Sequence, residues 1–189
     1  VGGSFLLNSR APGNTTIVCV LNRGGGYGIL LQSAERGKPA LEMQIGGRRV
    51  AYLDEGKGPV LLFLHGWAAP VSTYRLLTDH LAAYCRVVAP DLPGFGGSEE
   101  PPTAWDVDGY VDFTLQFIEA LGIREAVLMG HSFGGRIIIK LMNRPSLPLT
   151  VRKIVLMDAA GIKPKRPPSY YWKVYTLSLI HISEPTRPY

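Results

Sequence analysis

Ser132 stands between two glycines in the stretch Arg124–Gly135, R-E-A-V-L-M-G-H-S-F-G-G. The run Val127–Met129 is apolar and of strand length, and the apolar residues after the serine recur at the spacing of a buried helix. Gly130, Ser132 and Gly134 therefore fill a G-x-S-x-G pattern at a strand-to-helix junction, the setting of a nucleophile elbow. Such a turn strains the serine backbone, and glycine on each side lets neighbouring backbone pass closely. The pattern predicts that Ser132 is a nucleophile.

A glycine-rich turn at this place has two other interpretations. It could bind a phosphate at the start of the helix, or it could only close a packing gap. With 22 glycines in 189 residues, the letters alone are a weak signal. No P-loop lysine follows the glycines, and the strand-to-helix context favours the nucleophile.

A serine nucleophile also needs a base, an acid that orients the base, and N–H donors for the oxyanion. The loop His65-Gly66-Trp67 follows the apolar run Val60–Leu64. We expect this loop to direct the backbone N–H of Trp67 toward a carbonyl group lying over the serine. The second expected donor is the backbone N–H of Phe133, the residue after the nucleophile.

The composition indicates one domain with a single substantial core, because 46% of the 189 residues are apolar and 19% are charged. The net charge of +5 is scattered, without a basic helix stripe, so we expect no nucleic-acid partner. Cys19 and Cys85 support neither a disulfide framework nor a metal site, and we expect no cofactor. The run Val60–Leu64 is too short to span a bilayer. We expect a soluble, cytoplasmic protein that acts on a small molecule.

From Met43 onward, apolar strand runs alternate with helical patterns, which predicts a mostly parallel sheet with helices on both faces. Strands are expected at 60–64, 86–89, 127–129 and 153–157, after a hairpin over 43–52 with Gly46-Gly47 at its turn. Helices are expected at 72–83 with Ser72 or Thr73 as N-cap, at 107–121 ended by Gly122, and at 133–142. Asp91 ends its strand, and we expect it to organise the following loop by accepting hydrogen bonds from backbone N–H groups.

The beginning of the chain lacks this alternation. It starts at Val1, and its first methionine is Met43. We expect residues 1–42 to be translated upstream sequence or a disordered leader, and residues 43–160 to form the folded core. No signal peptide is expected, because no basic segment precedes the short apolar run in the leader.

The end of the chain departs from the pattern as well. Residues 161–176 mix charge, proline and aromatic residues and are expected to begin an inserted cap, in which Tyr170, Tyr171 and Trp172 suggest an apolar acyl or aromatic site. Residues 177–189 begin L-S-L-I-H-I-S-E-P-T-R, which matches the translation of a transposase-type sequencing adapter. We expect this tail to be an artefact. The other interpretation is a natural apolar helix end with a proline-rich tail.

Four motifs follow four successive strands: H-G-W, D-L-P-G-F-G-G-S, G-H-S-F-G-G and D-A-A-G. In these motifs the chain resembles the α/β-hydrolase superfamily, and within it the cap-bearing serine hydrolase branch, over about residues 43–176. The resemblance implies a mostly parallel twisted sheet with helices on both faces, here without the C-terminal part of the sheet and most of the cap. Family members that open epoxides or remove halide carry aspartate at the position of Ser132, so acyl transfer to water is favoured.

The resemblance also implies that the catalytic acid and histidine follow later strands, and this sequence has no such region. None of the four histidines is placed to activate the serine: His65 belongs to the oxyanion loop with a structural role, and the others are His80, His131 and His181. Asp158 follows the strand at 153–157, which is an alternative seat for the acid in some members of the fold. Its other interpretation is a carboxylate that binds loop amides.

The sequence therefore predicts a serine hydrolase that attacks an ester, a thioester or an activated ketone through an acyl-enzyme on Ser132. We expect this chain to be a fragment that is inactive or nearly so, with the edge strand 153–157 exposing unpaired backbone groups. Two alternatives stay open. One is a ligand-binding protein of the same fold without turnover, and the other is a reading frame without a cellular product.

Overall fold

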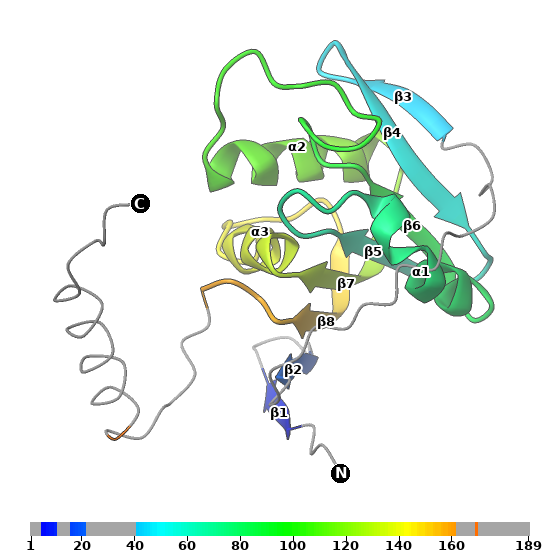
Figure 1. Cartoon of the computed structure of the whole chain (residues 1–189). Coiled ribbons are helices and arrows are strands. Elements are labelled where there is room, and N and C mark those ends of the chain that lie inside the picture. Colours follow the sequence, from blue (N-terminus) through cyan, green and yellow to red (C-terminus); the bar gives the residue numbers. More distant parts are fainter. Residues whose placement is uncertain (1–4, 11–15, 22–40, 162–168, 170–189) are drawn as a thin grey trace, which may run out of the picture.

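The structure is a computed structural model that describes residues 5–10, 16–21, 41–161 and 169 (Figure 1). The strands are β1 (Phe5–Arg10), β2 (Thr16–Leu21), β3 (Leu41–Ile45), β4 (Arg48–Glu55), β5 (Val60–Leu64), β6 (Arg86–Pro90), β7 (Glu125–His131) and β8 (Thr150–Met157). The helices are the 3₁₀ turn η1 (Val71–Tyr74), α1 (Arg75–Ala82), α2 (Val107–Ala120) and α3 (Phe133–Leu141). Within the described ranges, no helix is long and apolar enough to cross a membrane.

One sheet contains all these strands, in the order β1-β2-β8-β7-β5-β6-β4-β3. The pairs β5–β6, β5–β7 and β7–β8 are parallel, and β3 and β4 form an antiparallel hairpin at one edge. Gly46 and Gly47 turn that hairpin with φ of 55° and 77°, which glycine adopts without strain. The predicted parallel sheet and its leading hairpin are confirmed.

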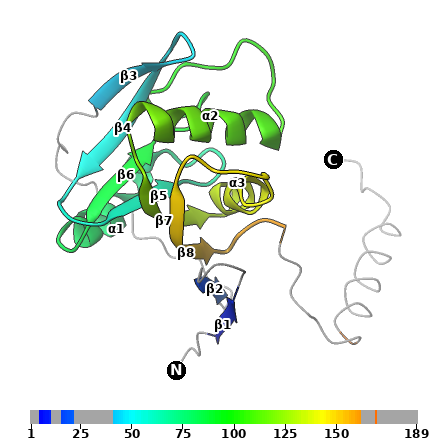
Figure 2. The same ribbon diagram turned by 180° about the vertical axis from the view of Figure 1, so that it is seen from behind.

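The helices cover both faces of the sheet, as predicted (Figures 1 and 2). Side chains alternate along each strand between the two faces. On β5, Leu62 and Leu64 join the larger apolar cluster with α2 and α3, whereas Leu61 and Phe63 join the smaller cluster with α1. Because β5 and its neighbours are apolar toward both faces, these strands appear in the sequence as continuous apolar runs.

The helix expected at 72–83 begins differently from the prediction. Residues 71–74 form a 3₁₀ turn in which the Thr73 N–H donates to the Pro70 carbonyl, and α1 starts at Arg75. Neither Ser72 nor Thr73 caps the α-helix, so that assignment was wrong: the turn supplies a backbone acceptor in place of a side-chain cap. By contrast, α2 is capped by the Asp106 side chain, which accepts a hydrogen bond from the Gly109 N–H at 3.0 Å.

The edge of the sheet at β8 also corrects the prediction. The parallel partner of β8 is β2, in a register that runs from Thr16 beside Lys153 to Val20 beside Met157, and β1 pairs with β2. The described β8 is therefore not the exposed edge that the sequence predicted. Both added strands fall in residues 1–42, the predicted leader, whose origin stays a prediction. The predicted segments 161–176 and 177–189 lie almost wholly outside the described residues.

Phe117 tests the packing between α2 and the sheet. Its ring is fully buried and meets the Tyr52 ring edge-on, with centroids 5.6 Å apart. We expect Phe117→Ala to lower the free energy of unfolding by about 3–5 kcal/mol, because a cavity adds to the lost apolar burial. Urea denaturation measures this change, and the exposed Glu119→Ala on the same helix should stay within about 0.5 kcal/mol of the parent. Equal stabilities for the two variants would contradict this packing.

Candidate active site

Ser132 occupies the turn between β7 and α3, with φ of 48° and ψ of −107°. This left-handed backbone is uncommon for any residue except glycine and costs about 1–3 kcal/mol, a strain found most often at functional sites. The residue is half-buried, and within the described residues its hydroxyl has no hydrogen-bond partner. The strand–turn–helix geometry predicted from the glycine pattern is present.

The glycines around Ser132 fill a steric need. A Cβ on Gly134 would overlap the Leu64 carbonyl oxygen at the end of β5 and lie 2.8 Å from the His65 carbonyl oxygen. A Cβ on Gly130 would lie 2.6 Å from the Gly135 nitrogen. The ends of β5 and β7 and the start of α3 therefore approach one another more closely than any side chain permits.

Both backbone groups of Ser132 are bonded to the segment that ends β8. Its N–H donates to the Met157 carbonyl at 2.9 Å, and its carbonyl accepts from the Ala160 N–H at 3.0 Å. The same carbonyl also accepts from the Arg136 N–H of α3 at 3.2 Å. These bonds hold the strained turn in place from outside its own strand and helix.

His65 begins the predicted oxyanion loop and is fully buried. Its Nε2 accepts a hydrogen bond from the Leu92 N–H at 2.8 Å, so Nδ1 must carry the proton and donate to the Gly66 carbonyl, 2.7 Å away. Burial lowers the pKa of His65 below 6.5, which keeps the ring neutral. Both ring nitrogens are thus used within the fold, in agreement with the structural role implied by the resemblance.

The bond from His65 sets the direction of the expected oxyanion donor. The Gly66 carbonyl and the Trp67 N–H belong to one trans peptide and point in opposite directions. Fixing the carbonyl therefore fixes the Trp67 N–H. Trp67 is 60% exposed, and its ring meets the Phe133 ring edge-on, with centroids 5.1 Å apart, so the two loops that carry the expected donors are in contact.

Asp91, at the end of β6, organises the neighbouring loops as predicted. Its Oδ1 accepts from the Val71 N–H at 2.7 Å, and its Oδ2 accepts from the Gly97 N–H at 2.9 Å. Gly96, with φ of 57°, passes so close that a Cβ there would overlap the Asp91 carboxylate. Asp91 has a backbone-binding role in this arrangement.

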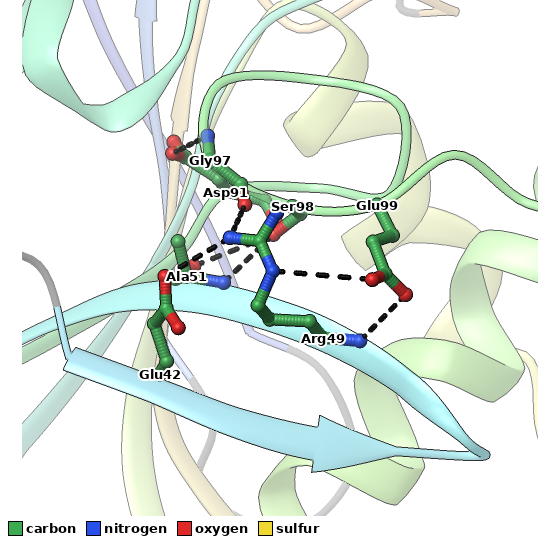
Figure 3. Close-up of polar contacts among 7 residues, drawn as sticks. All are labelled: Glu42, Arg49, Ala51, Asp91, Gly97, Ser98 and Glu99. Carbon is green, nitrogen blue, oxygen red and sulfur yellow. Dashed lines mark hydrogen bonds and ion pairs between the residues drawn. The ribbon is translucent and has the colours of Figure 1, made fainter.

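The loop after β6 is also tied to the β3–β4 hairpin (Figure 3). Arg49 Nη1 donates to the Gly97 carbonyl and to Glu42 Oε1, each at 2.9 Å, and the Arg49 N–H donates to Glu99 Oε2 at 3.0 Å. The buried Ser98 hydroxyl accepts from the Ala51 N–H at 3.0 Å. Each exposed ion pair contributes little stability, but together with the buried hydroxyl these contacts fix the loop on the hairpin.

A shallow, open pocket of about 290 Å³ lies between this loop and the start of α2. Three aromatic residues line it: Trp67, Phe95 and Tyr110. The ring centroids of Phe95 and Trp67 are 4.9 Å apart, and those of Tyr110 and Phe133 are 5.1 Å apart. The pocket therefore adjoins Phe133, the residue after Ser132. Such a lining suits an apolar or aromatic group, while the exposed Glu100 adds a carboxylate to the wall.

Asp158 follows β8 with φ of 44° and is exposed. Within the described residues its carboxylate has no hydrogen bond or ion pair, so its role as acid stays a prediction. The ring of His80 lies against Tyr84, 5.6 Å between centroids, and His131 is bonded to Tyr74. In residues 41–161 no histidine side chain is hydrogen-bonded to Ser132, and no cluster of His, Cys, Asp and Glu could hold a metal ion. His181 and the aromatic residues at 170–172 lie outside the described residues.

Tyr74 is a polar residue of this site that the sequence did not reveal. Its hydroxyl lies 2.8 Å from His131 Nδ1 and accepts from the Gly66 N–H at 3.4 Å. In the sequence it counts only as one more apolar position on the helix expected at 72–83. No local sequence pattern marks its hydroxyl, because Gly66 lies on another loop and His131 is distant along the chain.

The neutral His65 predicts how stability depends on pH. The folded pKa lies below the unfolded value of about 6.5, so below pH 6.5 the unfolded chain binds more protons than the native chain. The contribution of the neutral His65 to the free energy of unfolding should be fully present above pH 6.5. As the pH decreases, it should fall by up to about 1.4 kcal/mol per pH unit until the folded pKa is reached. Urea denaturation between pH 8 and pH 5 measures it.

Two variants separate this effect from the general titration of the protein. His65→Gln should remove the contribution from the slope, whatever its effect on absolute stability, whereas Ser72→Ala, at an exposed position that does not titrate, should keep the parent slope. A slope unchanged by His65→Gln would contradict the neutral, doubly bonded ring.

A profile of the alpha/beta hydrolase family matches residues 61–186, more than half of the chain. The chain is 38% identical over 136 residues to a 2-hydroxymuconate semialdehyde hydrolase of Pseudomonas sp. (strain CF600), covering 69% of this chain and 47% of the relative. A meta-cleavage product hydrolase from Pseudomonas fluorescens IP01 superposes with a TM-score of 0.58 at 30% identity, over 67% of this chain and 47% of that one. A membrane phospholipase A, a bacterial virulence factor, gives a TM-score of 0.62 at 28% identity, over 79% and 54%.

The chain thus spans about half the length of the curated relatives it matches. The names of the similar proteins differ in the substrates they state, so the comparisons agree on a fold rather than on one reaction. The parallel sheet, the strained serine turn after β7 and the family match all agree with the resemblance seen in the sequence. The chain belongs to the alpha/beta hydrolase family and has its fold.

Proposed function

We propose that the protein is a serine hydrolase that cleaves an ester, a thioester or the carbon–carbon bond of an activated ketone through an acyl-enzyme on Ser132. The observation that carries the proposal is the backbone of Ser132, left-handed and half-buried beside the oxyanion loop. A strained serine with an unbonded hydroxyl has no evident packing purpose. It suits a nucleophile.

In the proposed reaction, Ser132 Oγ attacks the carbonyl carbon of the substrate and gives its proton to a base. The N–H groups of Trp67 and Phe133 donate to the oxygen on which negative charge develops. The tetrahedral intermediate then collapses, and the leaving alcohol, thiol or carbanion takes a proton. Water attacks the resulting acyl-enzyme, which releases the acid and restores the serine hydroxyl.

The base is the component of this mechanism that the described residues do not supply. His65 is neutral with both nitrogens bonded, and His131 faces Tyr74. We propose that a histidine outside the described residues accepts the proton, with Asp158 as one candidate for the acid that orients it. Without that histidine the serine hydroxyl keeps its ordinary weak nucleophilicity, and this chain alone should turn over slowly or not at all.

The pocket supports an apolar or aromatic group on the substrate. Trp67 is a member of both the oxyanion loop and the pocket wall, so a group held by Phe95 and Tyr110 would lie near the reacting carbonyl. The similar proteins include hydrolases named for a semialdehyde and for meta-cleavage products, which supports a small-molecule substrate. No cofactor or metal takes part in the proposed mechanism.

A second candidate is a ligand-binding protein that uses the same pocket without turnover. It is favoured by the lack of a base beside Ser132 in the described part of the chain. In that case, the aromatic pocket would bind the ligand and the strained serine would have no chemical role.

A fluorophosphonate probe distinguishes the two candidates. We expect the full-length protein to be labelled at Ser132, Ser132→Ala to be unlabelled, and the exposed Ser72→Ala to be labelled like the parent. Ester turnover should fall by roughly 10⁴-fold or more in Ser132→Ala, because the nucleophile is removed. Peptide mass spectrometry locates the label.

Two outcomes would count against the proposal. Ligand binding in the pocket with neither labelling nor turnover in the full-length protein would favour the binding protein. Labelling of the 189-residue chain as fast as the full-length protein would contradict the expectation that this chain alone turns over slowly or not at all.

A further inference from the structure

Tyr74 lies at the end of the 3₁₀ turn η1, between the oxyanion loop and the elbow. Its hydroxyl oxygen is 2.8 Å from His131 Nδ1, the residue directly before Ser132. The same oxygen accepts a hydrogen bond from the Gly66 N–H at 3.4 Å. One hydroxyl therefore contacts both the oxyanion loop, through Gly66, and the turn that carries Ser132, through His131.

The chemistry of the groups fixes the direction of one of these two bonds. An amide N–H can only donate, so the Tyr74 oxygen accepts from Gly66. The bond between Tyr74 and His131 can run either way: the hydroxyl can donate to an unprotonated Nδ1, or a protonated Nδ1 can donate to the hydroxyl oxygen, which has two lone pairs. In both cases one hydroxyl links the Gly66 N–H to His131.

The space around this chain of bonds is tight. A Cβ on Gly66 would lie 2.8 Å from His131 Nδ1 and 3.3 Å from the Tyr74 oxygen. The Tyr74 ring is held edge-on by the buried Phe63, with centroids 4.9 Å apart. Neither the ring nor the Gly66 peptide can move far without the other.

Each of the two peptide groups that flank the Gly66 Cα is therefore held by a different side chain. His65 fixes the carbonyl side, which carries the Trp67 N–H, and Tyr74 fixes the N–H side. His65 connects the loop to the Leu92 backbone by a hydrogen bond, whereas the Tyr74 hydroxyl is in hydrogen-bonding contact with both the loop and His131 of the elbow.

We propose that Tyr74 is a positioning residue of the Ser132 site: its hydroxyl couples the Gly66 amide to His131 and so keeps the Trp67 N–H in register with the nucleophile. This inference rests on the proposed function. Tyr74 touches no reacting atom in this role. Its effect should appear in the step that develops charge on the oxyanion and leave substrate binding in the aromatic pocket unaltered.

The test uses the full-length protein, the fluorophosphonate probe and the variant Tyr74→Phe, which removes only the hydroxyl. We expect the rate constant of covalent modification at saturating probe to fall roughly tenfold, while the concentration for half-maximal rate changes less than about twofold, since small displacements of donors slow chemistry without weakening binding. Tyr84→Phe is the matched control, because Tyr84 is 73% exposed and its ring lies against His80 rather than His131. It should react like the parent.

A double-mutant cycle with His131→Phe tests the coupling. If the hydroxyl acts through His131, the double variant Tyr74→Phe/His131→Phe should react within about twofold of the slower single variant. Independent effects would instead multiply the two losses in rate. In addition, ¹⁵N chemical shifts of His131 should change at Nδ1 in Tyr74→Phe and stay unchanged in Tyr84→Phe. A purely structural role would lower the melting temperature without this pattern.

The outcomes separate this inference from the proposed function. An unlabelled parent protein would defeat the proposed function, and the positioning role with it. A labelled parent with Tyr74→Phe reacting as fast as Tyr84→Phe would overturn the positioning role alone. Multiplicative losses in the double variant, or an unchanged Nδ1 shift, would also overturn it.

Discussion

The close packing of backbone around Ser132 is the constraint on which the site depends. The residue adopts a left-handed conformation, and such a conformation persists only where the surroundings determine it. Here the surroundings are the carbonyl end of β5 against Gly134, the start of α3 against Gly130, and the end of β8 bonded to both backbone groups of the serine. The parallel sheet brings these strand ends to one edge, so the fold and the site have a common cause.

Much of the fold was accessible from the sequence because the central strands are buried on both faces. A continuous apolar run such as Val60–Leu64 is typical of a buried parallel strand when helical patterns flank it, and Gly122 ended α2 where predicted. The nucleophile elbow could also be predicted from the sequence, because its close backbone packing requires glycine at fixed positions around the serine. These signals are local, and each can be recognised within about fifteen residues.

The features that the sequence did not reveal depend on contacts between distant segments. The pairing of β2 with β8 joins Thr16 to Lys153, and no local pattern selects that partner. The proton position on His65 depends on where the loop of Leu92 places its amide, and the role of the Tyr74 hydroxyl depends on His131. The 3₁₀ turn replaced a side-chain cap because Pro70 offered a nearby carbonyl, a choice that propensities of Ser and Thr do not predict.

The hydrogen bonds between Ser132 and the segment after β8 have a consequence for biosynthesis. During translation Ser132 is added to the chain before Met157 and Ala160, so at that moment the partners of its backbone do not yet exist. The turn then lacks what enforces its unfavourable torsion, and the emerging polypeptide holds an ordinary serine. The unusual backbone geometry of Ser132 is therefore completed only when the next strand and the segment after it have docked.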